Sequence, residues 1–132
     1  MFNNLRCTFK EIYSLAKERR LEEELTYKDD EAYDLADFDI ADLEYSEKEK
    51  ALFNLLESLD FESVKIVQTI MYIGRDHDYS KSDTYEVRYR KYRESLDLNG
   101  WNEKEIEINQ IVQKVPLDTY LKDGFEILGI NI

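Results

Sequence analysis

Two side chains that often serve in catalysis occur once each in this chain of 132 residues, Cys7 and His77. Nucleophilic catalysis needs a nucleophile, a base and a group that orients the base, all within hydrogen-bond reach. Cys7 lies among apolar residues at helical spacing, where a buried or half-buried, unreactive thiol is usual. Pairs of carboxylates can be drawn by chance from the 30 acidic residues and indicate no reaction. We therefore expect a protein that is not an enzyme.

Asp76, His77 and Asp78 form the densest group of metal-ligating residue types. A divalent metal needs three or four converging ligands, and adjacent residues of a turn converge poorly. The EF-hand pattern, with its central Gly and distal Glu, is absent here and around residues 29–44. The four glycines stand too far apart for a phosphate-binding loop. We expect a capped helix end with an exposed His, and neither a metal nor a cofactor.

Residues 81–93 combine five basic side chains with tyrosines at helical spacing, Tyr85, Tyr89 and Tyr92. Basic and aromatic residues together could bind single-stranded nucleic acid. The net charge of −12 opposes this, because it repels phosphate. A row of tyrosines on one helix face more often packs into a core, and we expect no nucleic-acid partner.

The acidic excess is concentrated in residues 22–49, which we call the acidic segment. It carries thirteen acidic residues and two lysines, whereas residues 1–20 have a net charge of +3 and residues 50–132 one of −4. Six large apolar residues are interleaved with the acids, which a plain solubility tail would lack. They are Tyr33, Leu35, Phe38, Ile40, Leu43 and Tyr45.

Three interpretations of the acidic segment remain open. It could be a solvated face, it could pair with the basic residues of 81–93 within the same fold, or it could bind a basic protein partner. Charge that speeds encounter and aromatic anchors that slow release are typical of the third. The predicted partner-binding residues are Asp29, Asp30, Glu31, Tyr33, Asp34, Asp37, Phe38, Asp39, Asp42 and Glu44.

The apolar pattern predicts helices throughout most of the chain. A stripe of Leu5, Phe9, Ile12 and Ala16 predicts a helix over about residues 5–25, and 26–45 is either an amphipathic helix or a short helix within a loop. Capping patterns predict further helix starts at Ser46, at Asp60, at Ser80 or Ser82, and at Asn102. Residues 64–73 are apolar on several sides and predict the central core helix, and a last helix runs from Pro116 to Gly129.

One proline and four glycines leave little room for hairpin turns, and the length suits one domain. We expect an all-α, single compact domain over residues 1–132, with five to seven helices and little or no strand. No run of 18 apolar residues could span a membrane, and Met1–Arg6 leads into charged residues rather than an apolar stretch. We therefore expect a cytoplasmic protein without a membrane partner.

Two segments together carry a resemblance to a known family: Met71-Tyr72-Ile73-Gly74-Arg75, and the stretch from Val115-Pro116-Leu117 to Leu128-Gly129. They resemble the bacterial domain-of-unknown-function family 3775 over about residues 60–129. The resemblance implies a small helical fold and transfers no activity and no catalytic residue. The acidic segment and the Tyr- and Arg-rich helix depart from the family pattern.

The overall profile, without any residue motif, is similar to that of an immunity protein of a toxin–immunity pair, as in contact-dependent growth inhibition. That similarity implies an acidic protein that occupies the basic cleft of a toxin, such as a nuclease, or a site beside it. The alternative is a non-catalytic regulatory or structural adaptor, which could form oligomers and whose acidic segment docks on residues 81–93.

Overall fold

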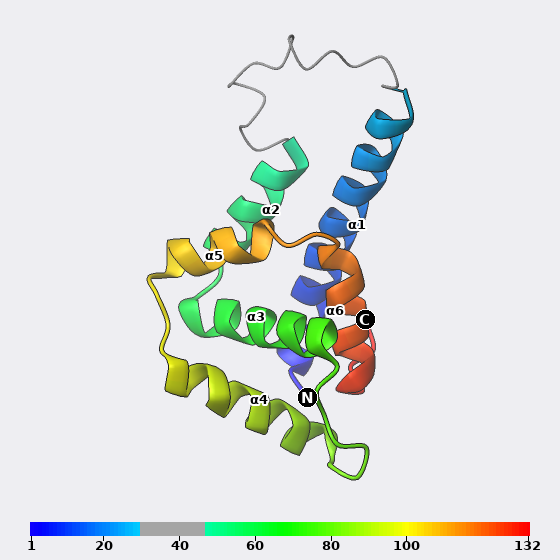
Figure 1. Ribbon diagram of the computed structural model, residues 1–132. Coiled ribbons are helices and arrows are strands. Elements are labelled where there is room, and N and C mark those ends of the chain that lie inside the picture. Colours follow the sequence, from blue (N-terminus) through cyan, green and yellow to red (C-terminus); the bar gives the residue numbers. More distant parts are fainter. Residues whose placement is uncertain (30–46) are drawn as a thin grey trace.

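The computed structural model describes residues 1–29 and 47–132, with side chains described for residues 1–22 and 47–132. Six α-helices and a short 3-10 helix (Asn3–Leu5) form this part of the chain, without a strand (Figure 1). The prediction of an all-α fold with five to seven helices is confirmed. The α-helices are α1 (Arg6–Asp29), α2 (Glu47–Glu57), α3 (Phe61–Asp76), α4 (Tyr85–Asn99), α5 (Lys104–Val112) and α6 (Leu117–Ile127).

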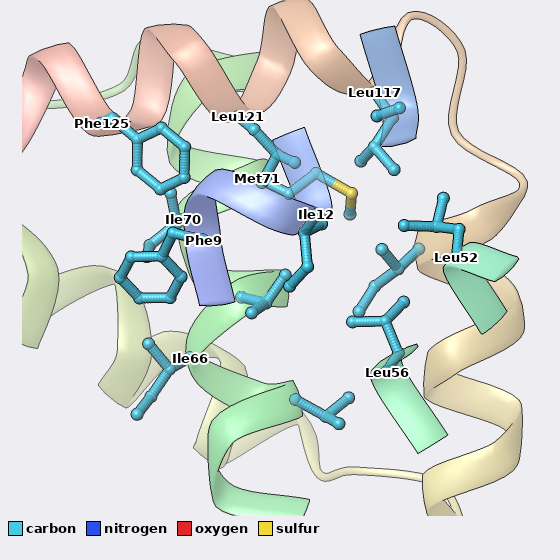
Figure 2. Packing of buried hydrophobic residues seen from close by; sticks show 14 of the residues in the cluster. Phe9, Ile12, Leu52, Leu56, Ile66, Ile70, Met71, Leu117, Leu121 and Phe125 are labelled. Carbon is cyan, nitrogen blue, oxygen red and sulfur yellow. The ribbon is translucent and has the colours of Figure 1, made fainter. Parts of the chain in front are cut away.

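Helix α3 is the central helix, as its apolar sequence predicts. It buries Val64, Val67, Ile70 and Met71 almost completely, and it packs against α6, α5 and α4. Figure 2 shows Ile70 and Met71 among side chains that come from α1, α2 and α6. The neighbouring helices bury apolar side chains against α3, and this burial is the main stabilising contribution to the fold.

Helices α3 and α6 cross with their backbones almost in contact. A Cβ atom added to Gly74 would lie 1.8 Å from the carbonyl oxygen of Tyr120, and one added to Gly124 would lie 2.2 Å from that of Ile70. Ordinary Cβ contacts begin near 3.4 Å. Gly74 does lie near the end of α3, as expected, but its structural role is this close crossing.

Helix α1 packs its predicted stripe against α2 and α6. Phe9, Ile12 and Ala16 are buried, and the helix continues four residues past the predicted end, to Asp29. Cys7 is exposed, so the prediction of a buried or half-buried thiol is wrong. Two residues correspond to about 200° of helical rotation, which turns Cys7 away from the face that Phe9 buries.

Two arginines of α1 fix it to the loop between α5 and α6. Arg19 is buried and donates hydrogen bonds to the carbonyl oxygens of Val112 and, at 2.8 Å, Lys114. Val112 is the last residue of α5 and Lys114 lies two residues beyond it, where no following helical turn supplies an N–H donor to their carbonyl oxygens. Arg20 donates at 2.8 Å to the carboxylate of Asp118, whose side chain is 4% exposed. The two guanidinium groups of α1 thus supply hydrogen-bond donors to the segment that connects α5 to α6 and a cation to the start of α6.

Several predicted helix caps and core positions are wrong. Helix α4 is capped by Thr84, whose hydroxyl accepts a hydrogen bond from the Val87 N–H at 3.3 Å, so it does not open at Ser80 or Ser82. Helix α5 has Glu103 rather than Asn102 at its N-cap. The spacing of Ile108, Ile111, Val112 and Val115 predicts one apolar stripe, but only the first three are buried; Val115 is 57% exposed, because it follows the end of α5.

The tyrosine row of α4 lies at the edge of the core rather than inside it. Tyr89 and Tyr92 are half-buried against the core, and Tyr85 is 49% exposed. The expectation of core packing therefore holds in part for two rings and fails for the third. The predicted cap at Ser46 falls outside the described residues, as does the segment 30–45.

Candidate functional site

Most of the predicted partner-binding residues lie outside the described part of the chain. Asp29 is the last residue of α1, and its side chain is not among those described. The end of α1 and the start of α2 lie at the same end of the molecule, so the acidic segment begins and ends there (Figure 1). The residues outside the description are Asp30, Glu31, Tyr33, Asp34, Asp37, Phe38, Asp39, Asp42 and Glu44.

An exposed ion pair joins the two helices that flank the acidic segment. The Nζ atom of Lys48 on α2 lies 2.9 Å from the carboxylate of Glu18 on α1. The hydrogen bond to Glu18 raises the pKa of Lys48. An exposed pair of this kind adds little stability; it joins the start of α2 to the middle of α1.

Four of the five basic side chains of residues 81–93, those of Arg88, Arg90, Lys91 and Arg93, contact groups of the folded body. Lys91 lies 2.9 Å from Asp83, and Arg90 lies 4.0 Å from Glu94. Arg88 donates to the carbonyl oxygens of Ser80 at 3.1 Å, Lys81 at 3.2 Å and Ile127 at 2.8 Å. Arg88 therefore holds the turn before α4 against the end of α6.

Arg93 joins α4 to α3. Its guanidinium donates to the two carboxylate oxygens of Glu62 at 2.9 and 3.0 Å and to Asp97 at 2.9 Å. The Arg93 hydrogen bond lowers the pKa of Glu62, and hydrogen bonds from Trp101 and then Arg93 lower the pKa of Asp97. A bidentate arginine–carboxylate contact is among the stronger surface ion pairs.

Helix α4 lies far from the two described ends that flank the acidic segment. Figure 1 shows α4 at the end opposite to the place where α1 ends and α2 begins. The internal pairing between 22–49 and 81–93, one of the three interpretations of the acidic segment, would have to compete with the partners that these cations already contact.

A groove of about 660 Å³ lies between the end of α3, the following turn and α4. The Tyr92 hydroxyl donates a hydrogen bond to the Asp76 carboxylate, and burial raises the pKa of this phenol. Arg75 also contacts Asp76, at 2.8 Å. Sequence reasoning singled out the cations and tyrosines but not the groove, which needs the turn to fold back. Its charged and aromatic lining comprises Tyr72, Arg75, Asp78, Tyr79, Asp83, Arg88, Lys91 and Tyr92.

The residues singled out for catalysis and metal binding are not brought together. His77 caps the end of α3 in a left-handed conformation, is exposed, and has its Nε2 3.2 Å from a carboxylate oxygen of Asp123. This confirms the capped helix end with an exposed His. Cys7 lines a shallow depression on α1 with Lys10 and Glu11. Within the described ranges, no three metal-ligating residues cluster.

No family model, curated protein or solved structure matches this chain. The resemblances to family 3775 and to immunity proteins therefore stay predictions. Of the helices that the structure describes, none combines the length and the apolar character needed to cross a membrane.

Proposed function

We propose that this protein is an immunity or inhibitor protein, which binds a basic protein partner in the cytoplasm and neutralises it through the acidic segment. A nuclease toxin domain is the partner class that fits best, because its cleft is built to hold phosphates. The proposal involves no catalysis, no cofactor and no nucleic-acid or membrane partner.

The observation that carries the proposal is that four of the five basic side chains of residues 81–93 already contact groups of the folded body. Arg88, Lys91 and Arg93 contact carbonyl oxygens and carboxylates of the folded body. If these three side chains turned to pair with the acidic segment, they would first have to break the hydrogen bonds and ion pairs that they make with the folded body. The charge of the acidic segment, net −11, therefore favours an external cation-rich surface over an internal one.

The residue types of the segment suit a tight complex. Long-range attraction speeds the encounter of oppositely charged proteins by orders of magnitude at low salt. Aromatic side chains that are buried on contact then slow dissociation. We expect Tyr33 and Phe38 to be such anchors, with the acids around them guiding the approach.

The first test is co-purification with the product of the adjacent upstream reading frame, at moderate salt. The proposal expects a 1:1 complex and a partner that is toxic when it is expressed alone. Absence of both a complex and toxicity would contradict it. In that case the mass in solution would decide whether the adaptor interpretation, with oligomers of this chain, applies.

The second test locates the interface in that complex. Asp34, Asp37 and Asp39 are changed together to Lys, and the association rate is measured over a range of salt concentrations. The matched control changes Glu103, Glu105 and Glu126, which are exposed on the body, to Lys. Both variants have the same net charge, so an equal effect would show that only overall charge matters. A slower association with a weaker salt dependence in the first variant alone supports the acidic segment as the interface.

Deletion of residues 26–45 separates this proposal from the adaptor alternative. If the acidic segment only binds a partner, the shortened chain keeps its fold and loses the complex. If the segment docks on residues 81–93, the deletion lowers the free energy of unfolding. Circular dichroism during urea denaturation measures this difference.

A further inference from the structure

A small polar pocket lies between α3, the C-terminal end of α4 and α5. Its volume is about 130 Å³, whereas one water occupies roughly 30 Å³ of the liquid. Its walls combine two aromatic rings with amides and one carboxylate, which is unusual for a space between packed helices. These wall residues are Gln68, Tyr72, Trp101, Asn102, Glu107 and Gln110.

The first unusual feature of the pocket is a buried amide oxygen without a donor. Gln68 is 1% exposed, and its Nε2 donates at 3.2 Å to the side-chain oxygen of Gln110. Its Oε1 accepts no hydrogen bond from any group among the described residues. The Tyr72 hydroxyl lies 3.4 Å from the Nε2 of the same amide. Buried polar atoms of native proteins nearly always have a partner, so this oxygen is an acceptor available to a donor that enters the pocket.

The second feature is a buried carboxylate without a counter-ion. Glu107 is 3% exposed, and its Oε1 accepts hydrogen bonds from the backbone N–H of Asn102 at 2.9 Å and from its side-chain amide at 3.1 Å. Within residues 1–22 and 47–132, no cationic side chain forms an ion pair with it. The two hydrogen bonds from Asn102 satisfy one carboxylate oxygen, and an entering cation would supply the counter-ion that a buried carboxylate favours.

We propose that this pocket binds a guanidinium group, supplied either by an arginine side chain of a protein partner or by a free small molecule. A guanidinium is flat, carries five N–H donors, pairs with a carboxylate through two hydrogen bonds and stacks on aromatic rings. Glu107 and the Oε1 of Gln68 supply the acceptors, and Tyr72 and Trp101 supply the rings. The proposal does not depend on the acidic segment.

The cations around the pocket set a limit on the affinity. Arg93 and Lys65 lie 5.6 and 5.5 Å from the centre of the Trp101 ring, and Arg75 and Lys114 lie 4.5 and 5.7 Å from the centre of the Tyr72 ring, so an entering guanidinium must share both rings with cations of this chain. Arg93 is balanced by Glu62 and Asp97. Lys65 forms no ion pair with a described residue and opposes an entering cation. Replacing it by Met should therefore strengthen binding of a cation and leave binding of a neutral molecule unchanged.

Trp101 is the only tryptophan and reports on the pocket directly. Its fluorescence is followed while methylguanidinium is added to the intact protein at constant ionic strength, with urea as the neutral molecule of the same shape. We expect a saturable change with a Kd of about 1 mM or below, and none with urea. No saturable change, or an equal one with urea, would overturn the proposal and leave a pocket that holds water.

Three variants give the titration its controls. Glu107→Gln keeps an acceptor for Asn102 and removes the charge, and should weaken methylguanidinium binding at least tenfold. Glu103→Gln removes an exposed charge one turn away and should leave the Kd unchanged. Gln68→Met tests the orphaned oxygen independently should Glu107→Gln fail to fold, as judged by circular dichroism. Unchanged binding in the folded Glu107 or Gln68 variant would overturn the proposal.

The source of the guanidinium is distinguished by a second ligand. A blocked tripeptide, acetyl-Ala-Arg-Ala-amide, is titrated beside methylguanidinium, with its Lys counterpart as the control. Tighter binding of the Arg peptide than of methylguanidinium indicates a protein partner, and weaker binding indicates a free small molecule. Binding of the Lys peptide as tight as that of the Arg peptide would overturn the assignment to a guanidinium.

Discussion

The close crossing of α3 and α6 predicts that Gly74→Ala and Gly124→Ala destabilise the protein. Helix propensity alone predicts the reverse, because Ala favours a helix interior by about 1 kcal/mol over Gly. The contacts decide the sign. To reach an ordinary distance of 3.4 Å, the new Cβ of residue 74 must move away from the Tyr120 oxygen by 1.6 Å, and that of residue 124 from the Ile70 oxygen by 1.2 Å.

Both atoms that would be struck belong to the backbone, so no side chain can rotate to relieve the clash. The helices must separate, and a gap of 0.5–1 Å already removes roughly a quarter to a half of each dispersion contact. Overpacking of a core costs about 1–3 kcal/mol, and this site belongs at the upper end. After subtraction of the gain in propensity, we expect a loss of about 2 kcal/mol for each variant.

Urea denaturation followed by circular dichroism measures this loss. With an m value of about 2 kcal/mol per M, the midpoint should fall by about 1 M. Ser95→Ala, on the exposed face of α4, is the control for propensity and should change the free energy of unfolding by less than about 0.5 kcal/mol. In the double variant Gly74→Ala/Gly124→Ala, one separation of the helices serves both methyl groups, so the loss should be smaller than the sum of the single losses. A midpoint that rises in either single variant would refute the reasoning.

Three further predictions concern the stability of the body. Arg20→Met leaves the buried carboxylate of Asp118 without its cation and should cost about 3 kcal/mol in urea denaturation, whereas Lys48→Met, at the exposed pair with Glu18, should change the midpoint within error. Thr84→Ala removes the cap of α4 and should cost about 1 kcal/mol, with Ser82→Ala, in the turn before it, as the control without effect. The pKa values of Glu62, Asp76 and Asp97 are lowered in the folded protein, so the stability they contribute is present above the unfolded carboxyl pKa of about 4 and is lost as the pH falls through the folded values. The melting temperature should therefore fall below pH about 4, and Arg93→Gln should make this fall smaller. An unchanged dependence of the melting temperature on pH in Arg93→Gln would contradict the assignment.

The helices were predictable because their signal is spread over many residues. Phe9, Ile12 and Ala16 repeat at helical spacing, and any one of them could change without hiding the pattern. The caps were less predictable because each depends on the backbone of one residue. Ser80, Ser82 and Thr84 all suit an N-cap by type, and only the fold selects Thr84.

Features formed by distant residues could not be predicted from one sequence. Gly74 and Gly124 are fifty residues apart, and nothing local marks them as neighbours. Gln68 and Glu107 each look like an ordinary polar residue of a helix surface, yet both are buried in one pocket. Arg19 comes three residues after Ala16 and so continues the stripe of Leu5, Phe9, Ile12 and Ala16, but the sequence does not show the backbone carbonyl oxygens of Val112 and Lys114 that accept its hydrogen bonds. Their roles depend on which helices meet.

The division of charge within the chain makes the two proposed sites separable by experiment. Residues 1–20 and 50–132 nearly cancel, at +3 and −4, so the field that a distant partner meets originates in residues 22–49. This field extends about 10 Å at ordinary salt and acts before contact. Where the guanidinium in the polar pocket is an arginine of the same partner, the pocket acts only after that arginine has entered it. Charge reversal in the acidic segment should therefore change the association rate and its salt dependence, and Glu107→Gln should change the dissociation rate alone. If both variants changed the association rate equally, the pocket and the segment would not be separate sites, and the assignment of a desolvated contact to Glu107 would be wrong.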